Sequence, residues 1–383
     1  MKKAAAWMLA LVLAVGTLTG CGSNDNSSSN GDKAGTEEST DKTNESTDKS
    51  SEGTYEIALV TDVGNIDDKS FNQGAWEGVV AYAEDNDVSY NYYRPSEDST
   101  EARVETMKTA IDKGAKVVVC PGYLFEEAIY AVQKDYPQTQ FLLLDGEPHD
   151  ADYNYETASN VHCILYQEEQ AGYFAGYAAV KEGYTELAFL GGMEVPAVQR
   201  YGFGYIQGAD AAAKEDGVQV NMKYWYSGSF SPSDDIMNKV SGWYTEGTEV
   251  VFACGGGIYL SATQAAEAAD AKVIGVDVDQ SAESDTIITS AMKELTTSVV
   301  LALGQLYDNN GTWPAELAGK TSTLGAADDC VGLPTAEASW RLEKYTVDEY
   351  TTLFEAVKAG DVAISNSVDA APDTTNVTVD FQN

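Results

Sequence analysis

The sequence predicts an α/β protein of two lobes, in which each lobe is a parallel sheet covered by helices on both faces. Short runs of β-branched and aromatic residues alternate along the chain with stretches whose apolar residues recur every three or four positions. The alternation comes in two consecutive series, separated by an irregular stretch at 145–160. The body of the chain, 54–383, is also too long for one compact core. These observations together predict two sheets.

The first series is predicted to form the first sheet and its helices. Its clearest helix carries Phe71, Ala75 and Val79 at intervals of four residues, and Gly114 stops the next helix. Short runs rich in valine, leucine and tyrosine give the strands. The expected strands are 55–61, 88–93, 116–120 and 140–144, and the expected helices are 70–84, 100–113 and 125–134.

The second series repeats the alternation after 160 and is predicted to form the second sheet. The expected helices are 168–181, 201–215, 232–244 and 259–270, and the expected strands are 186–190, 218–226, 250–253 and 272–276. A last helix is expected over 346–359, followed by a stretch at 362–367. The sequence leaves open whether this C-terminal part packs on one lobe or bridges both.

The first 21 residues have the pattern of an export signal. Lys2 and Lys3 precede an apolar run at 4–15, which is too short to span a membrane. Residues 18–21, Leu-Thr-Gly-Cys, resemble the bacterial lipoprotein box. This resemblance implies a signal peptide over 1–20, cleavage before Cys21 and acylation of its sulfur, with palmitate as the expected lipid. The alternative is ordinary secretion, with Cys21 having no special role.

The stretch that follows Cys21 is predicted to be a disordered tether. Residues 22–53 are almost entirely small, polar or charged, so they cannot bury enough surface to offset the entropy of ordering. As a flexible coil this stretch spans roughly 30 Å root-mean-square. Residues 21–53 would therefore be a lipid-bearing cysteine and a linker. Such a linker could let the domain reach a partner complex in the membrane, or it could simply be a solubilising spacer.

The charge and the chemistry-bearing residues exclude several functions. The formal net charge of −38 argues against nucleic acid and anionic lipid surfaces, which need stripes of Lys and Arg, and weakly against phosphorylated ligands. His149 and His162 are the only histidines, so zinc sites and Ser-His-Asp triads have few candidates. No phosphate-binding glycine loop or nucleophile-elbow motif occurs. We expect no enzymatic activity, cofactor or metal.

Four cysteines lie in the body of the chain. Cys120 and Cys254 each end an apolar run, which is typical of buried strand thiols. Disulfides are possible outside the cytoplasm, so a pairing that includes Cys163 or Cys330 stays open.

The residues that follow the expected strands indicate a ligand cleft. In parallel α/β sheets, ligands bind beyond the carboxyl ends of the strands. Here those positions are rich in Gly, Asp, Asn and Phe. The segments concerned are 62–72, 145–146, 191–192, 228–230, 255–257 and 277–280. Glycines let the backbone approach a ligand, and a few polar groups among aromatics suit a small molecule.

Three of these segments carry a family resemblance. The stretch 67–73, Asp-Asp-Lys-Ser-Phe-Asn-Gln, followed by Trp-Glu-Gly at 76–78, resembles the basic membrane protein family of substrate-binding lipoproteins of ABC transporters. Residues 276–280, Val-Asp-Val-Asp-Gln, and 290–293, Ser-Ala-Met-Lys, extend the resemblance. It covers about 55–333. The best-understood members of this family are purine nucleoside receptors.

The resemblance implies a type I periplasmic-binding-protein-like fold, with two Rossmann-like lobes joined by a hinge. The N-terminal lobe is expected to comprise 54–161 plus about 291–318, and the C-terminal lobe 162–290 plus about 319–383. A monomer is expected, held at the extracytoplasmic face of the cell membrane by Cys21. It would capture a purine nucleoside in the interlobe cleft and deliver it to an ABC permease.

The resemblance also implies roles for single residues. Phe71 and Phe230 would stack on the two faces of a base. Asn72 and Asp145 would bind the purine edge. Asp277 would accept hydrogen bonds from the two ribose hydroxyls, with Lys293 beside it. The remaining expected contacts are Asp62, from the first strand, and Gly256, through the main chain.

Alternatives stay open at several positions. Phe71 could belong to a helix core, and Phe230 could be an exposed loop aromatic. Asp279 competes with Asp277 for the sugar. Lys293 could be a solvated helix start, and Arg200 could bind an anionic ligand or cap the surface.

Alternatives also remain for the whole protein. A ligand-sensing lobe for a membrane kinase would use the same cleft, and the ligand could be another small molecule such as a sugar. A nucleoside hydrolase is disfavoured because no acid/base pair stands out.

Overall fold

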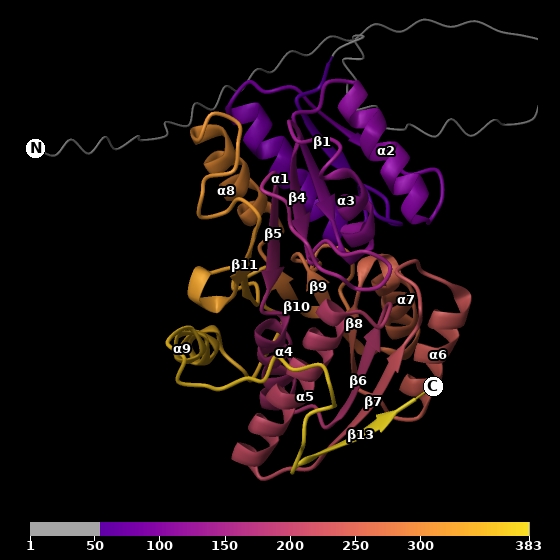
Figure 1. Cartoon of the computed structure of the whole chain (residues 1–383). Helices are drawn as coiled ribbons and strands as arrows, with labels where there is room; N and C mark the ends of the chain where they lie inside the picture. Colours follow the sequence, from indigo (N-terminus) through magenta and orange to yellow (C-terminus); the bar gives the residue numbers. More distant parts are fainter. Residues whose placement is uncertain (1–53, 383) are drawn as a thin grey trace, which may run out of the picture. The chain divides into compact units, whose positions relative to one another are not determined.

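The computed structural model describes residues 54–382, which contain two parallel sheets (Figure 1). The first sheet has the strand order β11-β5-β4-β3-β1-β2. Its strands are β1 (Ile57–Val60), β2 (Tyr90–Tyr93), β3 (Val117–Pro121), β4 (Gln140–Leu144), β5 (Val161–Tyr166) and β11 (Lys320–Leu324). The helices packed with this sheet are α1 (Phe71–Asp85), α2 (Thr100–Asp112), the short 3₁₀ turn η1 (Tyr123–Phe125), α3 (Glu126–Val132) and α8 (Leu295–Asp308).

The second sheet has the order β12-β10-β9-β8-β6-β7-β13, and only the β10–β12 pair is antiparallel. Its strands are β6 (Glu186–Gly191), β7 (Val220–Tyr226), β8 (Val250–Cys254), β9 (Lys272–Asp277), β10 (Ile287–Lys293), β12 (Val331–Gly332) and β13 (Val377–Phe381). Its helical segments are α4 (Glu168–Glu182), α5 (Pro196–Asp216), α6 (Asp234–Thr245), η2 (Gly256–Ile258), α7 (Tyr259–Ala269), η3 (Ala326–Asp328) and α9 (Val347–Lys358).

Both faces of the first sheet are covered, which explains why its central strands are apolar at every position. In β1, Ile57 and Leu59 join the core beneath α1 and α8, whereas Ala58 and Val60 join the core beneath α2 and α3. β1, β3 and β4 are buried along their whole length. The predicted fold class is therefore confirmed. The central strands are apolar at every position because helices cover both faces of the sheet, as predicted.

The chain passes between the two sheets three times. β5 leads from the first sheet into α4, β10 leads from the second sheet into α8, and β11 leads back to η3 and β12. Adjacent crossings are bonded to each other, because the Gln167 N–H donates to Leu324 O at 2.9 Å and the Glu294 N–H donates to Cys330 O at 2.9 Å. Main-chain hydrogen bonds therefore link neighbouring connecting segments to each other.

The lobe boundaries expected from the sequence need correction at three places, the first of which is 291–293, expected in the N-terminal lobe but part of β10 in the second sheet. We take each sheet with its helices as one lobe. β5 and β11 belong to the first sheet, although 162–166 and 319–324 were assigned to the C-terminal lobe. β5 pairs with β4 and β11, so the first lobe extends through both strands before the chain crosses over.

Helices α4 and α5 pack with their backbones almost in contact. A Cβ built on Gly172 would lie 2.0 Å from Tyr201 O, and one built on Gly204 would lie 2.1 Å from Glu169 O. Glycine is required because any side chain there would push the two helices apart. This close approach places Glu168, at the start of α4, beside Arg200 in α5.

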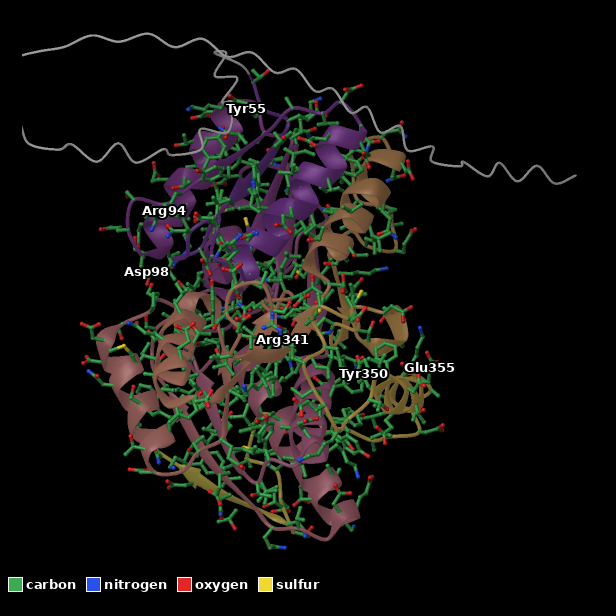
Figure 2. All side chains as sticks on the ribbon, turned by 180° about the vertical axis from the view of Figure 1, so that it is seen from behind. Tyr55, Arg94, Asp98, Arg341, Tyr350 and Glu355 are labelled. Carbon is green, nitrogen blue, oxygen red and sulfur yellow. The ribbon has the colours of Figure 1, made fainter. Side chains whose placement is uncertain are left out.

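The C-terminal stretch packs on the second lobe, which answers a question that the sequence left open. β13 pairs with β7 in register from Val377 to Phe381, and α9 contacts α4 and η3. Figure 2 shows Tyr350 and Glu355 of α9 to the right of Arg341. Arg341 donates to the main-chain oxygens of Ser281, Ser284 and Ile287.

Most expected elements are present within a few residues of their predicted bounds, and the differences are informative. α5 begins at Pro196 rather than at 201, because Pro at the first helical position fits a helix start. No helix or strand forms at 362–367, and the sequence did not predict β5, β10, β11, β12, β13 or α8. No helix of residues 54–382 is long and apolar enough to cross a membrane. The signal peptide, Cys21 and the tether lie outside the described residues.

Candidate functional site

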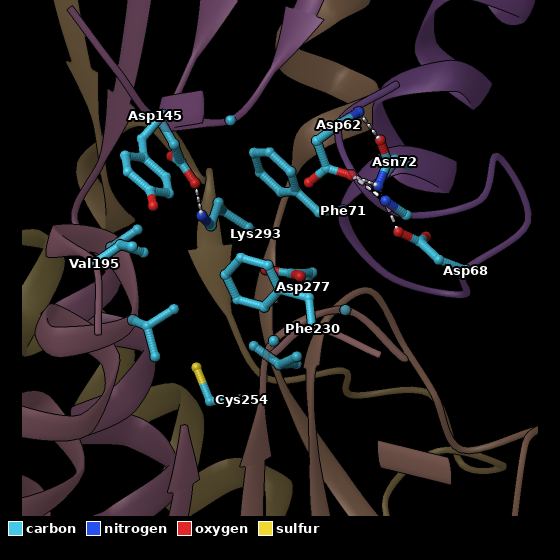
Figure 3. Close-up of a pocket in the computed structure, with 18 of the residues that line it drawn as sticks. Asp62, Asp68, Phe71, Asn72, Asp145, Val195, Phe230, Cys254, Asp277 and Lys293 are labelled. Atoms are coloured by element: carbon cyan, nitrogen blue, oxygen red, sulfur yellow. Dashed lines mark hydrogen bonds and ion pairs between the residues drawn. The ribbon is translucent and has the colours of Figure 1, made fainter. Parts of the chain in front are cut away.

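A pocket lies at the carboxyl ends of the central strands of both sheets, where parallel sheets place ligands (Figure 3). It encloses about 730 Å³ of space free of protein atoms, including solvent at its mouth. All eight residues singled out from the sequence line it. They are Asp62, Phe71, Asn72, Asp145, Phe230, Gly256, Asp277 and Lys293. Asp62, Phe71, Asn72 and Asp145 come from the first lobe, and the other four come from the second.

The two lobes present their strand ends to the pocket in the same way. β3 is followed by Gly122, with φ of 107°, before a 3₁₀ turn, and β8 is followed by Gly255, with φ of 135°, before another. β4 is followed by Asp145, with φ of 58°, and β9 ends in Asp277, with φ of 65°. Left-handed backbone is uncommon for residues other than glycine, and aspartate is among the residues that tolerate it. Each lobe thus turns one aspartate into the pocket from a strained strand end.

The two phenylalanine rings are held by different means. Phe71 opens α1, and Lys293 Nζ lies 4.9 Å from its ring centroid. Phe230 lies in the loop after β7, where glycines leave room for its ring. A Cβ on Gly192 would lie 2.4 Å from Phe230 Cδ1, and one on Gly255 would lie 2.8 Å from the same atom. Both rings therefore line the pocket, one from each lobe.

Lys293 ties two acidic side chains together at one end of the pocket. Its Nζ donates to Asp145 Oδ2 at 2.5 Å and to Glu168 Oε1 at 3.1 Å. Arg200 Nε donates to the other Glu168 oxygen at 2.5 Å. Burial by itself would lower the pKa of Lys293, but the charges of Asp145, Glu168 and Asp277 outweigh it and raise that pKa. Lys293 is therefore a buried, charged ammonium.

The acidic partners of Lys293 respond differently to burial. Burial raises the pKa of Asp145 to about 7 against the attraction of Lys293, and Asp145 Oδ1 is buried without a hydrogen-bond partner among the described residues. At Glu168 the two cations, Lys293 and Arg200, outweigh burial and lower the pKa. Asp145 therefore keeps one oxygen available at the pocket wall.

Asp277 is bonded from both lobes. Ser70 Oγ donates to its Oδ2 at 2.5 Å, and the Tyr201 hydroxyl lies 3.4 Å from its Oδ1. Burial raises the pKa of Asp277, although Lys293 and the Ser70 hydrogen bond act against this shift. Asp279, the other candidate, accepts from Ser281 N and Ser339 Oγ instead and does not line this pocket.

The other end of the pocket is a carboxylate pair organised by Asn72. The Asn72 amide donates to Asp62 Oδ1 at 2.8 Å and to Asp68 Oδ2 at 2.9 Å, and its oxygen accepts from Asp62 N at 3.1 Å. Asp68 also accepts from the main-chain N–H groups of 70, 72 and 73. Both donors of Asn72 are occupied by protein groups, so its role here is to hold Asp62 in place.

The pKa of Asp62 is raised to about 6, mainly because it is buried and also because Asp68 lies nearby. The hydrogen bonds from Gly64 N and Asn72 oppose this shift. Figure 3 shows Asp62 and Asn72 on one side of the Phe71 ring, and Asp145 and Lys293 on the other. Asn72 and Asp145, which the sequence analysis placed together on one purine edge, therefore lie at different ends of the pocket.

The structure also decides between the alternatives that the sequence left open for Lys293, Arg200 and the cysteines. Lys293 ends strand β10 and is 3 % exposed, so it is not a solvated helix start. Arg200 pairs with Glu168 and does not line the pocket, so it is not placed to bind a ligand there. The four cysteines among the described residues are buried free thiols, and Cys254 lines the pocket. Residues 54–382 contain no cluster of side chains suited to hold a metal ion.

Sequence reasoning missed several lining or supporting side chains. Glu168 was missed because β5 was not recognised, so the position after its end was not examined as a strand end. Tyr201, Val195 and Val198 lie around the first turns of α5, whose start was placed too late. Tyr123 follows β3 after Gly122, and its place beyond a strand end was an available signal.

The fold, with two parallel-sheet lobes, is shared with solute-binding proteins of known structure. A solute-binding protein of an ABC transporter system from Aeropyrum pernix superposes with a TM-score of 0.69 at 20 % identity, over 82 % of this chain and 94 % of that one. A second such protein, from Conexibacter woesei, gives a TM-score of 0.63 at 21 % identity, over 82 % of this chain and 99 % of that one. These likenesses establish the fold.

Residues 56–358 match the family described as "ABC transporter substrate-binding protein PnrA-like", and the chain belongs to this family. It is 28 % identical to the "ABC transporter nucleoside-binding protein BmpA" of Lactococcus lactis subsp. cremoris, over 78 % of this chain and 83 % of the relative. It is 27 % identical to "Basic membrane protein B" of Borreliella burgdorferi, over 73 % of this chain and 81 % of the relative. The resemblance to the basic membrane protein family is thereby confirmed.

Proposed function

We propose that this protein captures a purine nucleoside between its lobes and delivers it to an ABC importer, while Cys21 anchors it by lipid outside the cytoplasm. The observation that carries the proposal is the placement of Phe71 and Phe230, one from each lobe, on the same pocket. A flat heterocycle between two aromatic rings gains about 1–3 kcal/mol per stacking contact.

The charges that line the pocket support a neutral ligand with many hydrogen-bond donors. Asp62, Asp68, Asp145 and Asp277 face one cation, Lys293. Phosphate groups need several cations or free N–H donors, so a nucleotide is disfavoured. A nucleoside presents hydroxyl and N–H donors without a negative charge, which fits these carboxylates.

Asp277 and Lys293 suit the sugar. A carboxylate can accept from two neighbouring hydroxyls, and an ammonium can donate to their oxygens. Gly256 adds main-chain groups on the same lobe, next to Phe230. Ribose would thus be bound mainly by the second lobe, while Phe71 and Asp62 of the first lobe meet the base.

This division of contacts gives the protein a mechanism. Ligand that touches both lobes is fully bound only when the lobes are together, so it shifts the equilibrium toward the closed form. A permease that recognises the closed form would then receive loaded protein. The name of the Lactococcus relative, a nucleoside-binding protein of an ABC transporter, supports both parts of this proposal.

Titration calorimetry tests the ligand. We expect inosine or guanosine to bind with a Kd of about 1 μM or tighter, near −8 kcal/mol, and cytidine and free ribose to bind far more weakly. Phe71→Ala and Phe230→Ala should each weaken binding about 5- to 150-fold, because each removes one stacking face. Phe381→Ala is the control, since that ring lies half-exposed on β13, away from the pocket. No heat with any nucleoside would refute the proposal.

Uptake tests the delivery step. Cells that lack this protein should lose uptake of labelled nucleoside and regain it with the wild-type chain but not with Phe71→Ala. Export and anchoring are tested by Cys21→Ala, which should release the protein from the membrane fraction. Undiminished uptake in its absence would contradict delivery to an importer.

A further inference from the structure

The acidic side chains of the pocket differ in whether each oxygen already has a hydrogen-bond partner in the protein. Asp68 is saturated, because its two oxygens accept from main-chain N–H groups and from Asn72. Asp277 has one protein donor on each oxygen, Ser70 and Tyr201, so each of its oxygens can accept one further hydrogen bond. The oxygens without a protein partner among residues 54–382 are therefore Asp145 Oδ1, at the Lys293 end, and Asp62 Oδ2, at the opposite end.

Asp62 is held with this oxygen toward the ligand space. Its Oδ1 accepts from Gly64 N at 2.6 Å and from the Asn72 amide at 2.8 Å, which fixes the carboxyl group. Figure 3 shows one oxygen of Asp62 turned to Asn72 and the other turned toward Phe71. A Cβ built on Gly122 would lie 3.8 Å from Asp62 Oδ2 and 3.6 Å from Phe71 Cε1, so that oxygen and the edge of the Phe71 ring both border the pocket wall at Gly122.

A heterocycle stacked on Phe71 would present its edge to Asp62 Oδ2. An ionised carboxylate only accepts hydrogen bonds, so it attracts an N–H and repels a ring nitrogen with a lone pair. Guanosine and inosine carry an N–H at position 1 of the purine, whereas adenosine carries a lone pair there. A donor site that faces an acceptor is matched, while two acceptors that face each other in a water-poor pocket leave both unsatisfied.

We propose that Asp62 makes the site selective for 6-oxopurine nucleosides, through an N1–H donor to its free oxygen, over adenosine. This inference rests on the proposed function, because it assumes that a purine nucleoside occupies the pocket with its ribose at Asp277. Asp62 is then a specificity-determining residue, and Asn72 is a positioning residue that acts through it.

The preference should depend on pH, since a protonated Asp62 would itself donate to N1 of adenosine. The groups that face Asp62 are few. They are Gly64 N and Asp68 from the loop after β1, Asn72 from α1, and Arg103 from α2, whose guanidinium is bound to Asp98. No lysine, arginine or histidine within residues 54–382 forms an ion pair with Asp62. The raised pKa of Asp62, about 6, places its titration in an accessible range.

The test is calorimetry of the wild-type protein with guanosine, inosine, adenosine and 1-methylguanosine at pH 8.0 and pH 5.0. At pH 8.0 we expect guanosine and inosine to bind at least tenfold more tightly than adenosine, and 1-methylguanosine to bind at least tenfold more weakly than guanosine. At pH 5.0 the ratio of adenosine to inosine affinity should shift by at least fivefold toward adenosine.

Two variants separate specificity from a structural role. Asp62→Asn keeps the shape but offers a donor at any pH, so its adenosine-to-inosine ratio should rise and lose its pH dependence. Asp68→Asn is the matched control at pH 8.0, where Asp62 is ionised; because the oxygens of Asp68 serve protein groups, this variant should weaken all four ligands alike and leave the ratios at pH 8.0 unchanged. Equal affinity for inosine and adenosine at pH 8.0, or an unchanged ratio in Asp62→Asn, would overturn the inference but leave nucleoside binding intact. Absence of binding by every nucleoside would instead refute the proposed function.

Discussion

The two ends of the pocket hold similar carboxylates in opposite electrostatic settings. At the Lys293 end, Lys293 and Arg200 neutralise Asp145 and Glu168 through direct ion pairs. At the Asp62 end, two carboxylates share one neutral amide, Asn72, and no cation within residues 54–382 pairs with them. Buried charge is tolerated when it is paired and is costly when it is not. The first end therefore depends on its cations for stability, while the second is adapted to titrate and to accept donors.

Removal of the cation should produce the largest effect. Lys293→Met leaves Asp145 and Glu168 buried with Arg200 as their one remaining cation. Breaking a buried pair in this way costs about 3–5 kcal/mol, and we expect that loss in the free energy of unfolding by chemical denaturation. Lys108→Met is the control, since Lys108 is partly exposed and pairs with an exposed Glu105, and it should change stability by less than about 0.5 kcal/mol. A loss below about 1 kcal/mol for Lys293→Met would mean that the network is not buried as described.

Because no cation within residues 54–382 pairs with Asp62, we expect the free energy of unfolding to depend on the titration of Asp62. Because the folded pKa of Asp62, about 6, lies above the ordinary 3.8, the folded state holds this proton more tightly than the unfolded chain. The resulting stabilisation is complete below pH 3.8 and is lost as the pH rises through 6, a difference of about 2–3 kcal/mol. Asp62→Asn does not titrate, so its stability relative to wild type should increase by that amount between pH 4 and pH 8.

Asp150, on the surface, is a control whose pKa is shifted in the opposite direction. Hydrogen bonds from Asn154 lower the pKa of Asp150, so the contribution of Asp150 is present at higher pH and is lost as the pH falls. The stability of Asp150→Asn relative to wild type should therefore change in the reverse direction with pH. If Asp62→Asn followed the trend of Asp150→Asn, Asp62 would be stabilised as an anion and the contrast between the two ends would be wrong.

The smallest effect in this series concerns ligand affinity at the Lys293 end. Asp277→Asn removes the charge that would accept from the ribose hydroxyls, and hydrogen bonds to charged groups contribute about 1.5–3 kcal/mol. Calorimetry should show inosine bound about 10- to 150-fold more weakly. Asp279→Asn, two residues away but bonded to Ser281 and Ser339, should alter affinity less than twofold. Equal effects of the two substitutions would remove the argument for Asp277 as the sugar ligand.

The fold could be predicted from the sequence because its signals are local. Apolar strands such as 117–121 and 140–144 are short and uninterrupted, and the helices between them carry apolar residues on one face. β5 escaped recognition because His162 and Cys163 break the valine and leucine pattern, although both are buried. β13 escaped because it is an edge strand, with Asp380 and other exposed residues along it.

The members of the site were predictable, but their connections were not. Strand-end position and family resemblance together placed Asp62, Asp145 and Asp277 on one pocket. Which of their oxygens are occupied depends on pairs such as Ser70 with Asp277 and Lys293 with Asp145, whose members lie far apart in the chain. The charge of Glu168 is set by Arg200, and only the close packing of α4 on α5 brings these two side chains together.

A crystal structure of the protein with inosine is the most direct test of the central claim. We predict the base between the rings of Phe71 and Phe230, the ribose hydroxyls within hydrogen-bond distance of Asp277, and N1 within hydrogen-bond distance of Asp62. Inosine bound elsewhere, or with its base away from both rings, would contradict the account.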